Sequence, residues 1–228
     1  MKKIYLSLLI FSITLSSIAQ TTYWTSYNFS IDPENVESYI NIADEHFKNN
    51  TADGVTTYLY ENHISDSNNN YTHSIILAGS LEAMGAMYDS PKSKEWELFF
   101  AKINHFTESF SSAMGNRTLA FNNGDKPVQK YYFLDVADPA KYSAAFKKYA
   151  QYRPKSHQAL FGATTSGHSP EGESHWIVIG FDDFKSAIEG NSYRNNNPAA
   201  QKAWEEYREN RGETKLVRSG LRIMLRKW

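Results

Sequence analysis

Three arginines near the C-terminus have a spacing that suits anion binding. Arg218, Arg222 and Arg226 recur at every fourth position in and just after the segment KLVRSGLRIML (215–225). Side chains alternate between the two faces of a strand, so we expect these arginines on one face and the apolar residues on the other. A guanidinium group offers planar donors that match a carboxylate or a phosphate. One hypothesis is an anion-binding wall built by Arg218 and Arg222. The alternative is a solvated strand, or arginine–glutamate pairs that join two sheets.

Aromatic side chains alternate with small polar ones in two further segments. Tyr58 and Tyr60 share one side of segment 55–64, and Trp24, Ser26 and Asn28 share one side of segment 22–31. An aromatic surface with a few polar groups suits a small organic ligand. It also suits ordinary packing between two sheets, and either face of each strand could line an interior. The candidate ligand-binding residues are therefore Arg218, Arg222, Tyr58 and Tyr60.

Four histidines flank two polar turns and could contribute to a metal site. His63 and His73 lie on either side of the first turn, and His168 and His175 on either side of the second. Two histidines on adjacent strands can bind zinc or copper, but a competent site needs a third ligand. The spacing fixes no such ligand, and turns are usually exposed. These four residues are weak metal candidates, and surface histidines are the alternative.

Searches for established catalytic motifs give nothing. The chain has no G-x-G-x-x-G, P-loop, G-x-S-x-G or HExxH segment, so no nucleotide, triad or zinc-protease chemistry is indicated. It also has no cysteine, which excludes disulfides, thiolate zinc sites and a cysteine nucleophile. We predict no cofactor and assign no catalytic residue.

Several landmarks occur twice, in the same order, about a hundred residues apart. Trp96 and Trp204 stand in similar settings, each preceded by an Asp-Pro helix start and by a histidine followed by an apolar run. The paired segments are KEWELF (94–99) with KAWEEY (202–207), IDPENVESYI (31–40) with ADPAKYSAAF (137–146), and YTHSIILAG (71–79) with ESHWIVIGF (173–181). These matches predict an internal repeat. We expect both tryptophans to pack their helices onto a sheet.

Each half reads as strand, helix, two strands, helix and strand. The first half has strands at 22–31, 55–64, 73–79 and 116–121, with helices at 33–48, 80–89 and 94–110. The second has strands at 129–137, 156–165, 174–181 and 215–225, with helices at 139–152, near 182–190 and at 198–210. The assignments follow periods of two for strands and 3.6 for helices. This order is that of a ferredoxin-like split unit.

Such a sheet is covered by helices on one face, so its other face must be buried. With its Pro-then-Trp helices, SPKSKEW and NNPAAQKAW, the chain resembles the dimeric α/β-barrel superfamily over residues 22–228. The resemblance implies an α+β fold with two tandem units, 20–121 and 129–228, joined by a linker at 122–128. Their antiparallel sheets would pack face to face as a single-chain pseudo-dimer. It also implies cofactor-free oxygenation of aromatic substrates, isomerisation or haem chemistry, but no residue signature of these matches.

The N-terminus predicts export. The segment MKK precedes a Ser/Thr-diluted apolar run, and Ser17 and Ala19 fit a cleavage site, so residues 1–19 are interpreted as a signal peptide. No second apolar run follows, so no membrane span is expected in the mature form, which would be periplasmic or extracellular. The formal charge of −1 gives no general attraction to nucleic acid. A monomer or a small homo-oligomer is expected.

Three functions are consistent with these patterns. The first is an exported module that binds a small organic or anionic ligand between or within its units. The second is an enzyme of the cofactor-independent oxygenase or isomerase type. The third is a structural or interaction protein with a filled interior. An open cavity of a few hundred cubic ångströms would favour the first two.

Overall fold

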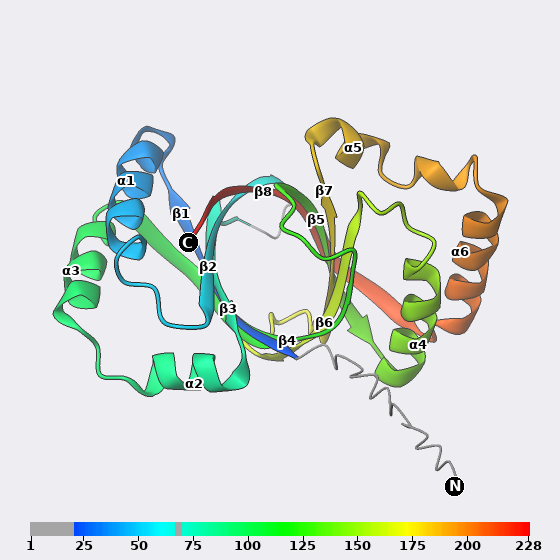
Figure 1. Ribbon diagram of the computed structural model, residues 1–228, viewed down its shortest axis with the longest axis horizontal. Coiled ribbons are helices and arrows are strands. Elements are labelled where there is room, and N and C mark those ends of the chain that lie inside the picture. Colours follow the sequence, from blue (N-terminus) through cyan, green and yellow to red (C-terminus); the bar gives the residue numbers. More distant parts are fainter. Residues whose placement is uncertain (1–20, 67–69) are drawn as a thin grey trace, which may run out of the picture.

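Eight antiparallel strands close into one barrel (Figure 1). The computed structural model describes residues 21–66 and 70–228, and the signal peptide predicted at residues 1–19 lies outside this part. Around the barrel the strands run β1-β3-β2-β8-β5-β7-β6-β4. They are β1 (Thr22–Ile31), β2 (Val55–Ser65), β3 (His73–Gly79), β4 (Thr107–Phe121), β5 (Val128–Val136), β6 (Gln158–Ser166), β7 (His175–Phe181) and β8 (Thr214–Lys227).

The helices cover the outside of the barrel in two groups, α1 to α3 on one side and α4 to α6 on the other (Figure 1). Their bounds are α1 (Val36–Phe47), α2 (Leu81–Asp89), α3 (Lys94–Ile103), α4 (Pro139–Ala150), α5 (Phe184–Glu189) and α6 (Pro198–Asn210), with short 3-10 turns η1 (Pro33–Asn35) and η2 (Ser192–Arg194). The Asp138 side chain caps α4 by accepting the Lys141 N–H at 3.0 Å, whereas Asp32 makes no capping bond. Among the described helices, none has the length and apolar character to span a bilayer.

The α+β class expected from the sequence is confirmed. Each half has the strand order fourth, first, third, second, namely β4-β1-β3-β2 and β8-β5-β7-β6. We expected two separate sheets packed face to face. Instead, β2 pairs with β8 and β4 pairs with β6, so the two sets of strands continue into one closed barrel. Closure leaves no open sheet edge between the halves, because the end strands of each half pair with those of the other.

The helix predicted at residues 94–110 is wrong in its second part. Helix α3 ends at Ile103, and β4 begins at Thr107. Phe106 and Phe110 extend the helical spacing of apolar residues, which made the longer helix plausible. In the structure, residues from Thr107 onward pair with β1, beginning with Thr107 opposite Ile31. Pairing in the barrel satisfies the backbone of this segment and overrides the local helical pattern.

Two buried clusters fill the spaces between barrel and helices. One includes Phe47, Leu59 and Phe99, and the other includes Phe146 and Phe161. Trp96 and Trp204 pack against these clusters, which contain strand residues as well as helix residues. The ring centroids of Trp96 and Phe47 of α1 are 5.9 Å apart, and those of Trp204 and Tyr149 of α4 are 5.3 Å apart. Each tryptophan therefore packs the later helix of its half against the earlier helix.

Four buried histidines make stability depend on pH. Burial lowers the pKa of His46, His73, His157 and His175, whereas an unfolded histidine binds its proton near pH 6.5. The unfolded state therefore binds more protons just below that pH, so stability falls as the pH is lowered. We expect the urea midpoint to decrease steadily from pH 7.5 to 5.5, and a His73→Gln variant to show a smaller decrease. A midpoint that does not change over this range would contradict the expectation.

Candidate functional site

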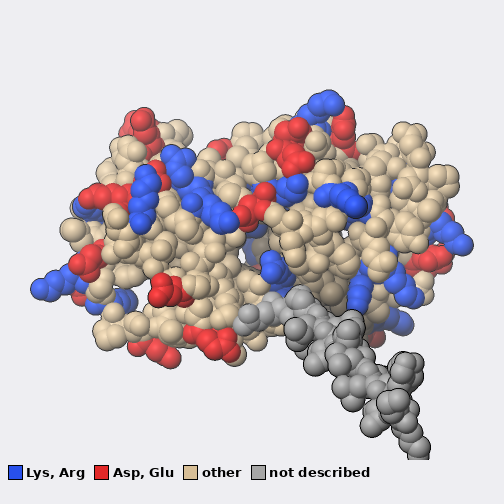
Figure 2. All heavy atoms as spheres, in the orientation of Figure 1, with Lys and Arg blue, Asp and Glu red and all other residues tan. Residues whose placement is uncertain are grey.

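The barrel encloses a cavity of about 440 Å³. Residues from all eight strands line it, because alternate side chains of each strand point inward. Arg218, Arg222, Tyr58 and Tyr60, the four residues selected from the sequence, are all in this lining. Figure 2 shows an opening at the centre of one face, bordered by both basic and acidic side chains. Whether these residues bind a ligand stays a prediction.

Arg222 is held in place by neutral neighbours. Its guanidinium lies 4.1 Å from the centroid of the Tyr60 ring, and its Nε donates to Gln129 Oε1 at 3.0 Å. Gln129 in turn donates from Nε2 to the Tyr60 hydroxyl at 3.3 Å. No carboxylate of residues 21–66 or 70–228 forms an ion pair with Arg222. Tyr60 and Gln129 thus fix the position of the Arg222 guanidinium without neutralising its charge.

Arg218 is paired with a glutamate, as one alternative to an anion-binding wall expected. It forms a short ion pair with Glu173 and lies 4.7 Å from the Phe133 ring centroid. Glu173 is 1% exposed and also accepts from the Ser169 backbone N–H at 3.2 Å. An arginine neutralised in this way positions the wall of the cavity more than it attracts an anion.

Arg226 does not share a face with the other two arginines, contrary to the prediction. The pairing of β2 with β8 shifts by one residue, since Leu59 is opposite Arg226 while Tyr60 is opposite Met224. This β-bulge reverses the inward and outward alternation. Arg226 therefore lies on the outer face, where its Nε is 3.1 Å from Asp44 Oδ2.

A further arginine, Arg117 on β4, was missed by the sequence interpretation. It lines the cavity, and its Nη2 donates to Thr22 Oγ1 at 2.6 Å. Burial lowers its pKa, and within the described residues no carboxylate pairs with it. Two residues earlier, Gly115 lies opposite Trp24 in the pairing of β1 and β4. A Cβ atom at Gly115 would come 2.8 Å from the Trp24 ring, so the glycine makes room for the indole.

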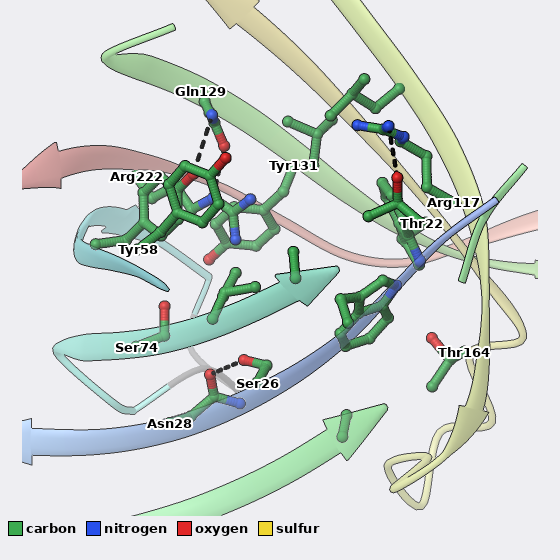
Figure 3. A pocket seen from close by; sticks show the side chains of 18 of the residues that line it. Thr22, Ser26, Asn28, Tyr58, Ser74, Arg117, Gln129, Tyr131, Thr164 and Arg222 are labelled. Atoms are coloured by element: carbon green, nitrogen blue, oxygen red, sulfur yellow. Dashed lines mark hydrogen bonds between the residues drawn. The ribbon is translucent and has the colours of Figure 1, made fainter. Parts of the chain in front are cut away.

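The second half repeats this arrangement between β5 and β8. Gly220 lies opposite Tyr131, and Arg222 lies opposite Gln129, as Gly115 lies opposite Trp24 and Arg117 opposite Thr22. Each half thus presents Gly-x-Arg on its last strand, with the arginine bonded to its cross-strand neighbour on the first strand. Figure 3 shows Arg117 and Arg222 on opposite sides of the cavity. Aligned with the repeat, the segments Gly115–Arg117 and Gly220–Arg222 could have revealed Arg117 from sequence.

Aromatic rings form much of the remaining wall. Trp24 and Trp176 meet edge to face with centroids 5.9 Å apart, and the Tyr131 hydroxyl donates to Asn62 Oδ1 at 2.7 Å. The Tyr58 hydroxyl donates to Asp125 Oδ1 at 3.1 Å. Desolvation raises the pKa of Tyr58, so this hydroxyl is a neutral donor near neutral pH. The cavity therefore combines flat apolar surfaces with a few hydrogen-bonding groups.

The weak metal candidates are not brought together. His63 bonds Glu61 at 2.8 Å, His73 bonds the Thr72 hydroxyl at 2.8 Å, and His175 bonds the Ser174 hydroxyl at 2.9 Å. His168 Nδ1 is 2.5 Å from the Glu173 carbonyl oxygen. In the part of the chain that the structure describes, no group of three or more metal-ligating side chains occurs.

The family resemblance raised haem chemistry, in which a side chain such as histidine holds the iron. The two buried clusters pack between the barrel and the helices. The cavity inside the barrel has no histidine among its described lining residues, so it offers iron no imidazole ligand.

Several solved structures share the fold of this closed barrel with its outer helices. A candidate monooxygenase from Fusobacterium nucleatum subsp. nucleatum aligns with a TM-score of 0.59 and 12% identity, over 92% of this chain and 95% of that one. An anthrone oxidase-like protein aligns with a TM-score of 0.53 and 12% identity, over 91% and 92%.

A variant of the chlorite dismutase from Candidatus Nitrospira defluvii also has this fold, with a TM-score of 0.54 and 12% identity over 90% of this chain and 92% of that one. No protein-family model matches the chain, and no curated protein matches its sequence. At such low identity, the likeness establishes the fold and leaves the activity to be argued from the cavity.

Proposed function

We propose that the protein binds a small organic anion inside its barrel. The observation that carries this proposal is the pair Arg117 and Arg222, which line the cavity and have no carboxylate partner among the described residues. A partly buried cation without a counter-charge is unfavourable, and an anionic ligand would relieve it. Charge-assisted bonds from a guanidinium are among the stronger polar contacts available to such a ligand.

The size and the walls of the cavity support an organic ligand. Its volume of about 440 Å³ lies within the range of small-molecule sites, about 300–1,000 Å³. Trp24, Trp176 and Tyr131 supply aromatic surface for a ring, and Tyr58 and Tyr60 supply more. An open interior of this size also argues against the structural alternative, in which side chains would fill the barrel.

Benzoate and benzamide provide a matched test, since they differ mainly in charge. We expect benzoate to quench the fluorescence of Trp24 and Trp176 and to bind at least about tenfold more tightly than benzamide, because a charged hydrogen bond contributes about 1.5–3 kcal/mol. An Arg222→Gln substitution should reduce the affinity for benzoate by about tenfold. Titration of intrinsic fluorescence measures both effects.

Arg226→Gln is the matched control, because Arg226 lies on the same strand but outside the cavity, paired with Asp44. It should bind benzoate as the unmodified protein does. Equal affinities for benzoate and benzamide would refute an anion site. A loss of benzoate binding in Arg226→Gln that equals the loss in Arg222→Gln would show that net charge, and not the cavity, attracts the ligand.

A second candidate is a cofactor-independent oxygenase, because fold neighbours carry the names monooxygenase and anthrone oxidase-like protein. The same cavity would hold an aromatic substrate beside the Trp24 and Trp176 rings. Anthrone is the natural probe: oxygen uptake in its presence, lost on blocking the cavity with benzoate, would favour this candidate. Benzoate binding without oxygen uptake would favour a binding module.

We further propose that the two halves are tandem copies of one ferredoxin-like unit, forming a single-chain pseudo-dimer. The equal strand orders and the repeated Gly-x-Arg arrangement support a duplication. Export through residues 1–19 to the periplasm or the medium is likewise a proposal, which rests on the sequence of that segment. Terminal sequencing of the protein from its own host tests it, with Gln20 expected as the first residue.

A further inference from the structure

We propose that the ligand is a dianion with an anionic group at each end, and that it bridges Arg117 and Arg222 across the barrel. This inference rests on the proposed function and narrows it to a class, aromatic dicarboxylates of low mass. It is carried by three observations: the equivalent placement of the two arginines, the charge balance of the cavity and the aromatic surface between them.

The two arginines occupy equivalent positions on opposite walls. In the closed order of strands, three strands separate β4 from β8 in either direction, so the strands that carry Arg117 and Arg222 face each other across the interior. Both side chains extend into the same space (Figure 3). Each is oriented by one neutral oxygen from its cross-strand neighbour, Thr22 Oγ1 at 2.6 Å and Gln129 Oε1 at 3.0 Å. The cavity therefore has two similar donor groups, one at each side.

The charge balance leaves these two cations unmatched. The other charged residues of the lining are paired, Arg218 with Glu173, and Asp125 with Lys227 from outside the lining. Arg117 and Arg222 form no ion pair with the described carboxylates. A ligand with one anionic end would neutralise one arginine and leave the other with its hydrogen-bonding capacity unused. Two anionic ends would satisfy both, and each guanidinium could bind its carboxylate through two donors.

The surface between the arginines favours a flat ligand body. Trp24 is opposite Gly115, and Arg117 is opposite Thr22. Trp24 and Arg117 are therefore diagonal neighbours on the inner face of β1 and β4. Tyr131 lies beside Arg222 in the same way, and Trp176 meets Trp24 edge to face. Aromatic rings prefer such offset or edge contacts with another ring. A phosphate monoester carries both charges at one end, so it would satisfy one arginine at most.

The test uses terephthalate and its monoamide, 4-carbamoylbenzoate, which have the same shape and differ by one charge. Naphthalene-2,6-dicarboxylate and its monoamide form a longer pair, and phenyl phosphate places two charges at one end. In titration calorimetry with the full chain, we expect at least one diacid to bind about tenfold or more tightly than its monoamide, as one added charged bond implies. Phenyl phosphate should bind no more tightly than a monoamide.

Arg117→Gln and Arg222→Gln should each bring the diacid and its monoamide to within about threefold of each other, since each variant removes one end of the bridge. Arg226→Gln should preserve the difference. The comparison in the unmodified protein stands even if a variant fails to fold, which a thermal melt reveals. If both monoamides bind as tightly as their diacids, or phenyl phosphate binds most tightly, the bridging inference fails while the proposed anion site stands. If no probe binds, both fail.

Discussion

Replacing Glu173 by glutamine is expected to lower the free energy of unfolding by about 3 kcal/mol, as removing one partner of a buried ion pair does. The Glu173 side chain is 2% exposed and that of Arg218 is 16% exposed, so water compensates little of the charge on the arginine that remains. Glutamine keeps the shape and one acceptor oxygen but removes the negative charge. The variant would also weaken the bonds that Glu173 accepts from Ser169. Urea denaturation followed by circular dichroism measures the change.

The double variant Glu173→Gln with Arg218→Gln is the matched control. Because it removes both charges, it should recover a substantial part of the stability lost by the single substitution. Arg218→Gln alone should also be destabilising, since it leaves a buried carboxylate unpaired. A loss below about 1 kcal/mol in Glu173→Gln, a value typical of exposed pairs, would mean that the pair is effectively solvated and does not brace the cavity wall.

The sequence was informative where a local pattern alone decides the structure. Helix α6 begins at Pro198 and ends at Asn210, as predicted, because Pro at the first position and an Asn197 cap fix its start. Tyr58 and Tyr60 share one face of β2 because of simple alternation, and the structure places that face inward. Arg218 and Arg222 share a face for the same reason.

Features that depend on cross-strand register could not be predicted in this way. The β-bulge that turns Arg226 outward arises from the pairing of β2 with β8, and one extra residue is enough to reverse a face. Strand spacing alone does not single out Arg117, whose partner Thr22 lies 95 residues away; only alignment of the two halves does. The Arg218–Glu173 pair joins residues 45 positions apart. Strand spacing cannot choose between an anion site and such a pair.

Glycines opposite the inward aromatic rings set how far the cavity can open. Gly162 lies opposite Trp176 in the pairing of β6 and β7, as Gly115 lies opposite Trp24 and Gly220 opposite Tyr131. A ring that lies over a glycine stays close to the barrel wall, and the space at the centre remains free. Aromatic side chains of this size would otherwise occupy a large part of the interior.

Gly162→Ala is therefore expected to lower the free energy of unfolding by about 3 kcal/mol, the upper range for inserting a methyl group into a packed site. The new Cβ would overlap the Asn116 carbonyl oxygen and the Trp176 ring, whose Cε2 atom would be 2.7 Å away. Because one of these obstacles is backbone, a side-chain rotation cannot relieve the overlap. Urea denaturation gives the loss of stability, and tryptophan fluorescence reports any displacement of Trp176 into the cavity.

Gly85→Ala is the matched control for the same chemical change. Gly85 lies within helix α2 (Leu81–Asp89), and a Cβ there would meet nothing within 4 Å. Alanine should raise stability by about 0.5–1 kcal/mol, because glycine loses more conformational freedom in a helix. Equal effects of the two substitutions would show that backbone entropy dominates at both sites. The opposite signs expected here would instead tie the Gly162 effect to the overlap with the Asn116 carbonyl and the Trp176 ring.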